Sequence, residues 1–173
     1  MAKEYTVLEL MACVASKVLE DDKSVLVGTG LPMMAATLAQ RTHAPGLLIV
    51  FEAGGVGPKI PTLPISVGDS RTMHRAVMAG SMDYVMSSAQ LGYVDYAFLG
   101  AAQIDAYGNI NTTIIGQYDA PTVRLPGSGG GNDAGSLCWQ SIILMRQDRR
   151  RFVKRVDFIT TPGHRMGSLS REE

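Results

Sequence analysis

One short apolar run of this 173-residue sequence is followed by a carboxylate and a turn without bulky side chains. The run Leu47–Phe51 is typical of a buried strand, Glu52 comes directly after it, and Ala53, Gly54 and Gly55 follow. A carboxylate at a strand end can attack an activated acyl group or act as a general base. Small neighbours would let a bulky substrate reach it. The alternative interpretation is a strand-end acid that hydrogen-bonds a neighbouring loop.

Two glycine-rich segments offer backbone N–H groups. In "PGSGGGND", the amides of Gly129, Gly130 and Gly131 can point at one spot and hold an anion or an oxyanion. A flexible surface loop explains this segment equally well. In "VGTGLP", Gly28 and Gly30 follow an apolar run and would let a ligand approach the backbone. Neither segment is a nucleotide signature, because the P-loop Gly-Lys-Ser/Thr and the third glycine of a dinucleotide fingerprint are missing.

Amide side chains gather in the segment "QIDAYGNINTT". Gln103 and Asn111 could donate N–H bonds to a substrate carbonyl or carboxylate, and we place Asn109 with them as a candidate substrate contact. A turn that is fixed by its own backbone contacts explains Asp105, Gly108 and Asn109 equally well.

The elements that must hold these residues alternate between helix and strand. Apolar residues at helical spacing, such as Leu8 and Val14, predict a first helix that Thr6 caps, with Glu9 completing a capping box. Pro32 fits the first turn of a second helix. Strands are expected at Ser24–Gly30, Leu47–Phe51 and Asp95–Asp105, and again within "QSIILMRQ" and "RRFVKRVDFITTPG".

These strands are short and rich in Val, Leu and Ile, which is typical of parallel strands that are covered on both faces. We therefore predict an α/β fold with an open, mostly parallel sheet flanked by helices, in a single domain that covers residues 1–173. Ligands of open sheets bind at the carboxyl ends of the strands. Gly28–Gly30, Glu52–Gly55 and Gln103–Asn111 are accordingly expected to converge on one crevice.

Composition and charge argue against several other classes of protein. Lys and Arg number 16 and so do Asp and Glu, so no overall basic field attracts nucleic acid or a lipid surface. The basic stretch Arg146–Arg155 is interpreted as a solvated helix end or a partner contact. Cys13 and Cys138 are interpreted as small core residues. We find no signal peptide or membrane-spanning run and expect a cytoplasmic protein with no membrane partner.

Two familiar kinds of catalytic centre are not indicated. The three histidines lack the paired spacing of a metal site, and we predict no metal. The segment "GSGGG" lacks the strand-to-helix context of a serine nucleophile. The histidines are His43, His74 and His164.

The order of "VGTGLP", "FEAGG", "GAAQIDAYGNINTTIIGQYDAPTVRLPGSGGGND" and "RRRFVKRVDFITTPG" resembles the B subunit of glutaconate-type CoA-transferases of family I. The resemblance runs roughly from Tyr5 to Gly163. It implies that Glu52 is the nucleophile, forming a mixed anhydride and then a glutamyl-CoA thioester. It also implies N–H donors from the loop Gly127–Gly131 and a site lining from Gly28–Pro32. The substrate and CoA contacts expected are Gly28, Gly30, Gly54, Gly55, Gln103, Asn109 and Asn111.

The resemblance further implies the substrates and the assembly. CoA would move between an acyl-CoA thioester and a carboxylate or dicarboxylate acceptor, at an interface with an A subunit of the CoA-transferase. The expected assembly is a heterotetramer or larger. Exchange between a thioester and a carboxylate is nearly isoenergetic, so no permanently bound cofactor is expected and CoA is itself a substrate.

Two other functions stay open at this point. The chain could be an acyl-CoA hydrolase or lyase on the same scaffold, with Glu52 as a general base, or a non-catalytic partner chain. The B subunits of this family usually continue for several tens of residues past the segment matching "TTPG", whereas this chain ends at Glu173. We therefore expect a C-terminally truncated form, a fragment, or a chain whose missing strands come from elsewhere.

Overall fold

The computed structural model describes residues 4–164, which divide into two compact units. Unit 1 is the described part of Met1–Leu99 together with Leu137–Leu144, and unit 2 is the described part of Gly100–Ser136 and Met145–Glu173. The single domain expected for residues 1–173 stays a prediction.

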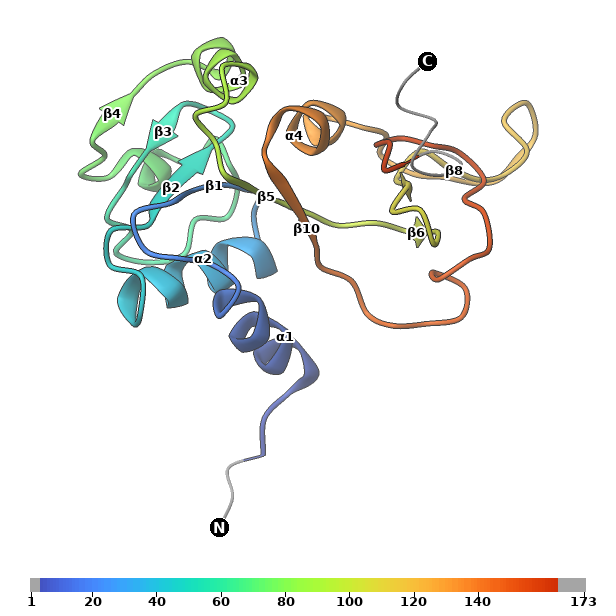
Figure 1. Ribbon diagram of the computed structural model, residues 1–173, viewed down its shortest axis with the longest axis horizontal. Helices are drawn as coiled ribbons and strands as arrows, with labels where there is room; N and C mark the ends of the chain where they lie inside the picture. Colours follow the sequence, from blue (N-terminus) through green and yellow to red (C-terminus); the bar gives the residue numbers. More distant parts are fainter. Residues whose placement is uncertain (1–3, 165–173) are drawn as a thin grey trace. The chain divides into compact units, whose positions relative to one another are not determined.

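Unit 1 is built on a six-stranded mixed sheet (Figure 1). Its strand order is β10-β5-β1-β2-β3-β4, and the first four of these strands are parallel. The last two are short and antiparallel. The strands are β1 (Ser24–Val27), β2 (Leu48–Phe51), β3 (Gly55–Val56), β4 (Met78–Ala79), β5 (Tyr96–Leu99) and β10 (Gln140–Ile143). The predicted α/β class with a mostly parallel sheet is confirmed.

The helices of unit 1 begin where the sequence indicates. In α1 (Val7–Ser16), Thr6 accepts from the Glu9 amide and the Glu9 side chain accepts from the Thr6 amide, so the capping box is confirmed. Proline lies in the first turn of α2 (Leu31–Arg41), as expected. A 3₁₀ turn, η1 (Ser70–Met73), and α3 (Met82–Gln90) follow later in the chain. No described helix is long and apolar enough to cross a membrane.

The core of unit 1 lies between the sheet and α2. Val25, Val27, Ile49 and Phe51 are buried on the strands, and α2 meets them with an alanine-rich face. Small side chains let the helix axis approach the sheet closely. The α2 residues in this core are Met33, Ala35, Ala36 and Ala39.

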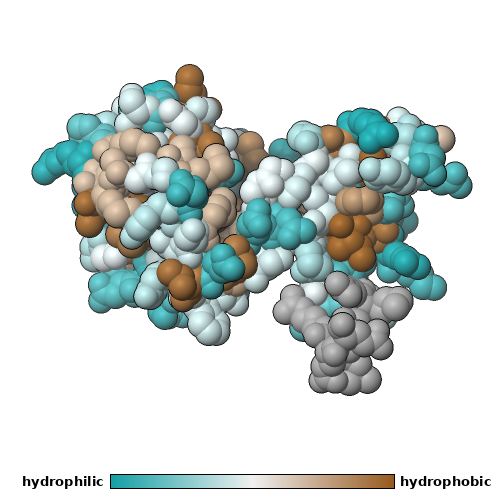
Figure 2. Space-filling model, turned by 90° about the horizontal axis from the view of Figure 1, so that it is seen from above, coloured by the Kyte–Doolittle hydropathy of each residue, from teal (hydrophilic) through white to brown (hydrophobic). Residues whose placement is uncertain are grey.

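The apolar residues whose spacing predicts α1 are mostly exposed. Leu8 and Val14 are largely exposed, and the helix packs on α2 through its small residues Ala12, Ala15 and Ser16. Helical spacing gives the period of the apolar positions but not which of two apolar faces is covered. Several apolar patches are visible on the surface of unit 1 in Figure 2.

Unit 2 is made of two β-hairpins and irregular segments. The hairpins pair β6 (Gln103–Ile104) with β7 (Ile110–Asn111), and β8 (Ile114–Gly116) with β9 (Pro121–Arg124). The short helix α4 (Gly131–Leu137) starts in this unit.

Two expected strands differ from the structure. The run Asp95–Asp105 contains two strands, β5 and β6, that belong to different sheets. The chain leaves β5 at Gly100 and pairs with another strand again only at β6. Its middle, Gly100–Ala102, has no β-branched side chain to favour a continuous strand. The last predicted strand, in "RRFVKRVDFITTPG", is also wrong, since it makes only the isolated bridges of Phe152 and Thr161. The basic stretch Arg146–Arg155 is not helical, so it is not the end of a helix.

The two cysteines should react at very different rates. Cys13 is exposed, so its predicted core position is wrong, whereas Cys138 is buried as predicted. Burial raises the pKa of the Cys138 thiol to about 11, which leaves roughly one thiol in a thousand ionised at a pH of about 8. A colorimetric disulfide reagent should therefore modify one thiol rapidly and the second only on unfolding. Cys13→Ser should remove the rapid phase, and equal rates for both thiols would contradict the assignment.

Candidate active site

Glu52 occupies the tip of a tight turn between β2 and β3. The Gly54 amide donates to the Phe51 carbonyl at 2.9 Å, so Glu52 and Ala53 are the central residues of the turn. In the parallel pair, Val27 of β1 lies opposite Phe51 of β2. Gly28 follows β1 and Glu52 follows β2. Both residues therefore lie where the chain leaves the carboxyl edge of the sheet. This is the edge where open α/β sheets bind ligands.

The Glu52 side chain is half-buried, and its carboxylate has no hydrogen-bond or ion-pair partner among residues 4–164. A structural acid at a strand end would hydrogen-bond a neighbouring loop, and no such bond is formed by the described residues. A partly desolvated carboxylate whose lone pairs are not engaged can instead act on a substrate. The geometry favours the reactive interpretation of Glu52.

The turn after β1 is open, as the sequence indicates. An added Cβ at Gly28 or Gly30 would meet no atom within 4 Å, and Gly30 has φ +79°, in the left-handed region that favours glycine. Gly30 is the N-cap of α2 and supplies no side-chain cap. The amides of Leu31 and Met33 consequently have no acceptor within the helix.

The uncapped start of α2 was not identified from the sequence. It places N–H donors and the positive end of an 11-residue helix at the edge that carries Glu52. The signal was present, because "GTGLP" has glycine where Ser, Thr, Asp or Asn would normally cap a helix. An arrangement of this kind can stabilise negative charge on a bound substrate.

Gly28→Ala should separate substrate access from folding. Because the space beside Gly28 is empty in the protein and its φ is not left-handed, the free energy of unfolding should change by less than about 0.5 kcal/mol. Catalytic efficiency should fall about tenfold or more if a substrate fills that space. Urea unfolding and steady-state kinetics of the same preparation give both values. Unchanged kinetics would remove Gly28 from the site.

The glycines after Glu52 have a packing reason that the sequence did not reveal. A Cβ at Gly54 would lie 2.1 Å from the Gly80 carbonyl oxygen, and one at Gly55 would lie 2.2 Å from the Thr72 carbonyl oxygen. Gly54 also has φ +116°. Backbone therefore approaches backbone at both positions, and a substrate contact is not needed to explain them. Their role as substrate contacts stays a prediction.

In unit 2, the amide side chains predicted to meet substrate are buried and already hydrogen-bonded. Gln103 donates to Asp157 at 3.0 Å and accepts from Asn111 at 2.7 Å. Asn111 also accepts from the amides of Thr113 and Ile114. Asn109 donates to the Asp105 carboxylate at 3.0 Å and accepts from the Gly163 amide. The structure thus gives these amides a positioning role, whatever substrate contacts they make.

Asn111→Ala should destabilise the protein. The side chain is fully buried, and truncation leaves the amides of Thr113 and Ile114 without this acceptor. It also removes one of the two donors to the Gln103 side-chain carbonyl, the other being the Asp157 amide. The expected loss is about 2 to 3 kcal/mol in the free energy of unfolding. Urea unfolding measures it, with Asn132→Ala on the same unit as a less buried control. A loss no larger than that of the control would contradict the network.

The glycine-rich loop of unit 2 is fixed at both ends. Gly127 donates to the Thr112 carbonyl and accepts from the Thr112 hydroxyl, each at 2.8 Å. At the other end Gly131 donates to the Ser128 carbonyl, so its amide is already used. The amides of Gly129 and Gly130 have no acceptor among the described residues. Of the three predicted donors, these two keep their N–H groups available.

The sequence itself decides the family. Residues 8–171 match the family described as coenzyme A transferase. The chain belongs to the coenzyme A transferase family. This finding agrees with the resemblance seen in the glycine-rich and "FEAGG" segments.

Three known proteins are similar over almost the whole chain. The B subunit of 3-oxoadipate CoA-transferase from Pseudomonas knackmussii is 38% identical over 176 residues, which cover 98% of this chain and 65% of the relative. The crystal structure of glutaconate CoA-transferase from Acidaminococcus fermentans matches with a TM-score of 0.91 at 35% identity, covering 98% of this chain and 66% of that one. The decarboxylase AibA/AibB matches with a TM-score of 0.85 at 30% identity, covering 94% and 68%.

The chain therefore spans 65% of the length of the 3-oxoadipate relative.

Among the described residues, no group of three or more His, Cys, Asp and Glu side chains is placed to hold a metal ion.

Proposed function

We propose that this chain is the B subunit of a CoA-transferase and that Glu52 carries the acyl group and then CoA. The observation that supports this most is the position of Glu52, half-buried and without a partner among the described residues, at the carboxyl edge of the sheet. Membership of the coenzyme A transferase family supplies the reaction class.

The proposed reaction proceeds through two covalent intermediates. A Glu52 carboxylate oxygen attacks the thioester carbonyl of acyl-CoA, the carbon–sulfur bond breaks, and a mixed anhydride and CoA thiolate are formed. The thiolate attacks the Glu52 carbonyl of the anhydride, releasing the acyl group as a carboxylate and leaving a glutamyl-CoA thioester. The acceptor carboxylate then repeats these steps in reverse and leaves as its CoA ester, which restores Glu52.

Negative charge develops on oxygen in every step, and N–H groups are the natural means of stabilising it. The amides of Leu31 and Met33 at the start of α2 lie at the same sheet edge as Glu52. We propose the amides of Gly129 and Gly130 as further donors. Each well-placed oxyanion donor lowers the barrier by about 3 kcal/mol.

A carboxylate is a weak nucleophile, so positioning must supply much of the acceleration. Effective concentrations of about 10⁵ M or more are attainable when two reactants are held in contact. Water must also be excluded, because the anhydride and the thioester would otherwise hydrolyse. Partial burial of Glu52 contributes to both requirements.

The partner and substrates follow from the same proposal. The 3-oxoadipate relative is named as a B subunit, and we propose an A subunit for this chain, in a heterotetramer or larger assembly. The substrates would be an acyl-CoA and a carboxylate or dicarboxylate acceptor, with no permanently bound cofactor.

A carbon–carbon lyase or a hydrolase is the second candidate. The observation in its favour is the structural similarity to the decarboxylase AibA/AibB. In that case Glu52 would act as a general base and would form no covalent intermediate.

Trapping the intermediate distinguishes these functions. The chain, purified with its A subunit, is incubated with a panel of acyl-CoAs and treated with borohydride, which reduces a thioester to an alcohol. Mass spectrometry of the tryptic peptide between Arg41 and Lys59 should show Glu52 reduced only when acyl-CoA is present. Free CoA released without any acceptor, with Glu52 unmodified, would instead indicate the hydrolase. A shortened acyl-CoA with its thioester intact would indicate the lyase. No turnover at all would indicate a non-catalytic chain.

A further inference from the structure

Unit 2 contains a cavity of about 870 Å³ that the proposed chemistry does not use. Its volume is in the range of small-molecule sites. Two buried polar residues, one aromatic side chain, one branched apolar side chain and two cations line it. They are Asp105, Asn109, Tyr107, Ile159, Lys154 and Arg155.

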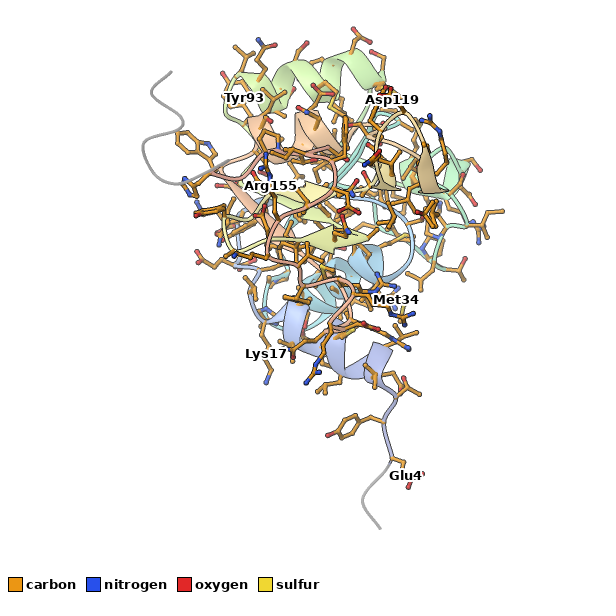
Figure 3. The ribbon with its side chains drawn as sticks, turned by 90° about the vertical axis from the view of Figure 1, so that its right-hand side faces the viewer. Glu4, Lys17, Met34, Tyr93, Asp119 and Arg155 are labelled. Atoms are coloured by element: carbon orange, nitrogen blue, oxygen red, sulfur yellow. The ribbon has the colours of Figure 1, made fainter. Side chains whose placement is uncertain are left out.

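The two cations are held at the cavity by backbone pairing. The Ile104 amide donates to the Arg151 carbonyl at 2.7 Å, and the Val153 amide donates to the Ile104 carbonyl at 2.9 Å. This pairing fixes the chain alongside β6 just before Lys154 and Arg155. Figure 3 labels the Arg155 side chain on this segment.

Neither cation has a counter-ion among the described residues. Elsewhere in the basic stretch, Arg150 pairs with Asp148 at 3.2 Å and Arg151 donates to the Ala101 carbonyl. Lys154 and Arg155 make no ion pair within residues 4–164. The cavity therefore carries excess positive charge that an anionic ligand could neutralise.

The floor of the cavity is rigid, and its single lining carboxylate is engaged. Asp105 is buried and accepts hydrogen bonds from the Tyr107 amide and from the backbone and side chain of Asn109, at 3.0 to 3.2 Å. Its charge is thereby satisfied within the loop, and it does not need the two cations as partners.

The aromatic ring at the cavity is exposed although its backbone is fixed. Tyr107 is 44% exposed, its amide donates to Asp105 and its carbonyl accepts from the His164 amide at 2.9 Å. A flat ring beside an apolar side chain, with a lysine and an arginine close by, suits a ligand that combines a heteroaromatic ring with phosphates.

We propose that this cavity binds the phosphorylated nucleotide end of a CoA ester, with Tyr107 against the adenine ring and Lys154 and Arg155 at the phosphates. The assignment of CoA as the source of the nucleotide rests on the proposed function. The cavity, its charge and its aromatic ring are independent of Glu52.

Adenosine 3′,5′-bisphosphate, which carries no pantetheine arm, is the direct probe. Calorimetric titration of the full chain should show binding that Arg155→Glu weakens about tenfold or more, with Lys154→Glu acting similarly. Tyr107→Ala should also weaken it, and Tyr107→Phe should not. Arg149→Glu is the matched control, because Arg149 is exposed in the same stretch, undergoes the same change of charge and does not line the cavity.

The same variants have a kinetic signature. Arg155→Glu should raise KM for acyl-CoA about tenfold and leave kcat and the KM for an acyl-pantetheine, which lacks the nucleotide, unchanged. Absence of binding to the wild-type chain, an equal loss with Arg149→Glu, or equally tight binding of inorganic phosphate would each overturn the nucleotide site. Unchanged KM and unchanged binding in Arg155→Glu would also overturn the nucleotide site, but this result would not contradict the proposed CoA transfer. If the wild-type complex shows no CoA transfer, the calorimetric titration still shows whether the cavity binds the nucleotide.

Discussion

Glu52→Gln is expected to lower kcat/KM for CoA transfer by at least about 1,000-fold, which corresponds to about 4 kcal/mol of lost transition-state stabilisation. The amide has almost the same shape as the carboxylate but is not a nucleophile. Because the Glu52 carboxylate makes no hydrogen bond or ion pair within the described residues, the free energy of unfolding should change by less than about 0.5 kcal/mol. Steady-state kinetics of the complex with its A subunit measure the first effect, and urea unfolding measures the second.

Two further variants sharpen this experiment. Glu52→Asp keeps the carboxylate but withdraws it by one methylene, and a misplacement of this size should cost about 100-fold. Glu20→Gln is the control, since Glu20 is an exposed acid in the same unit and precedes β1. Full activity of Glu52→Ala, which cannot revert by deamidation, would refute the nucleophile assignment.

Gly54→Ala is expected to reduce the free energy of unfolding by about 4 kcal/mol, the largest stability effect we foresee. Its Cβ would lie 2.1 Å from the Gly80 carbonyl oxygen, which belongs to backbone and cannot rotate away. The residue would also be held at φ +116°, where alanine is strained. The hydrogen bond from the Gly80 amide to the Gly54 carbonyl, at 2.8 Å, ties the two segments together and prevents relief by a small shift.

Gly68→Ala is the matched control for this substitution. Gly68 is an exposed turn residue whose added Cβ would meet nothing within 4 Å, and its φ is not left-handed. Gly68→Ala should change the free energy of unfolding by less than about 0.5 kcal/mol. Equal stability of the two variants in urea unfolding would show that Gly54 is not packed as described.

Much of unit 1 could be predicted because its signals are local. The Thr6–Glu9 capping box and the proline at the start of α2 depend on residues within one or two turns of each other. The buried strands β1 and β2 are continuous apolar runs. Unit 2 was predicted less well, because its short hairpins and single bridges carry no repeating pattern, and Asp95–Asp105 was read as one strand for that reason.

The sequence by itself determined the α/β class, the family and the position of Glu52 at the end of a strand, because each depends on the order of residues along the chain. Only the tertiary structure decided why Gly54 is glycine, that Gln103 is bonded to Asp157, and that the cations before Val156 face a cavity. Those features join backbone and side chains that are distant in sequence. A close approach or a hydrogen bond between such groups leaves no mark on the residues next to either of them.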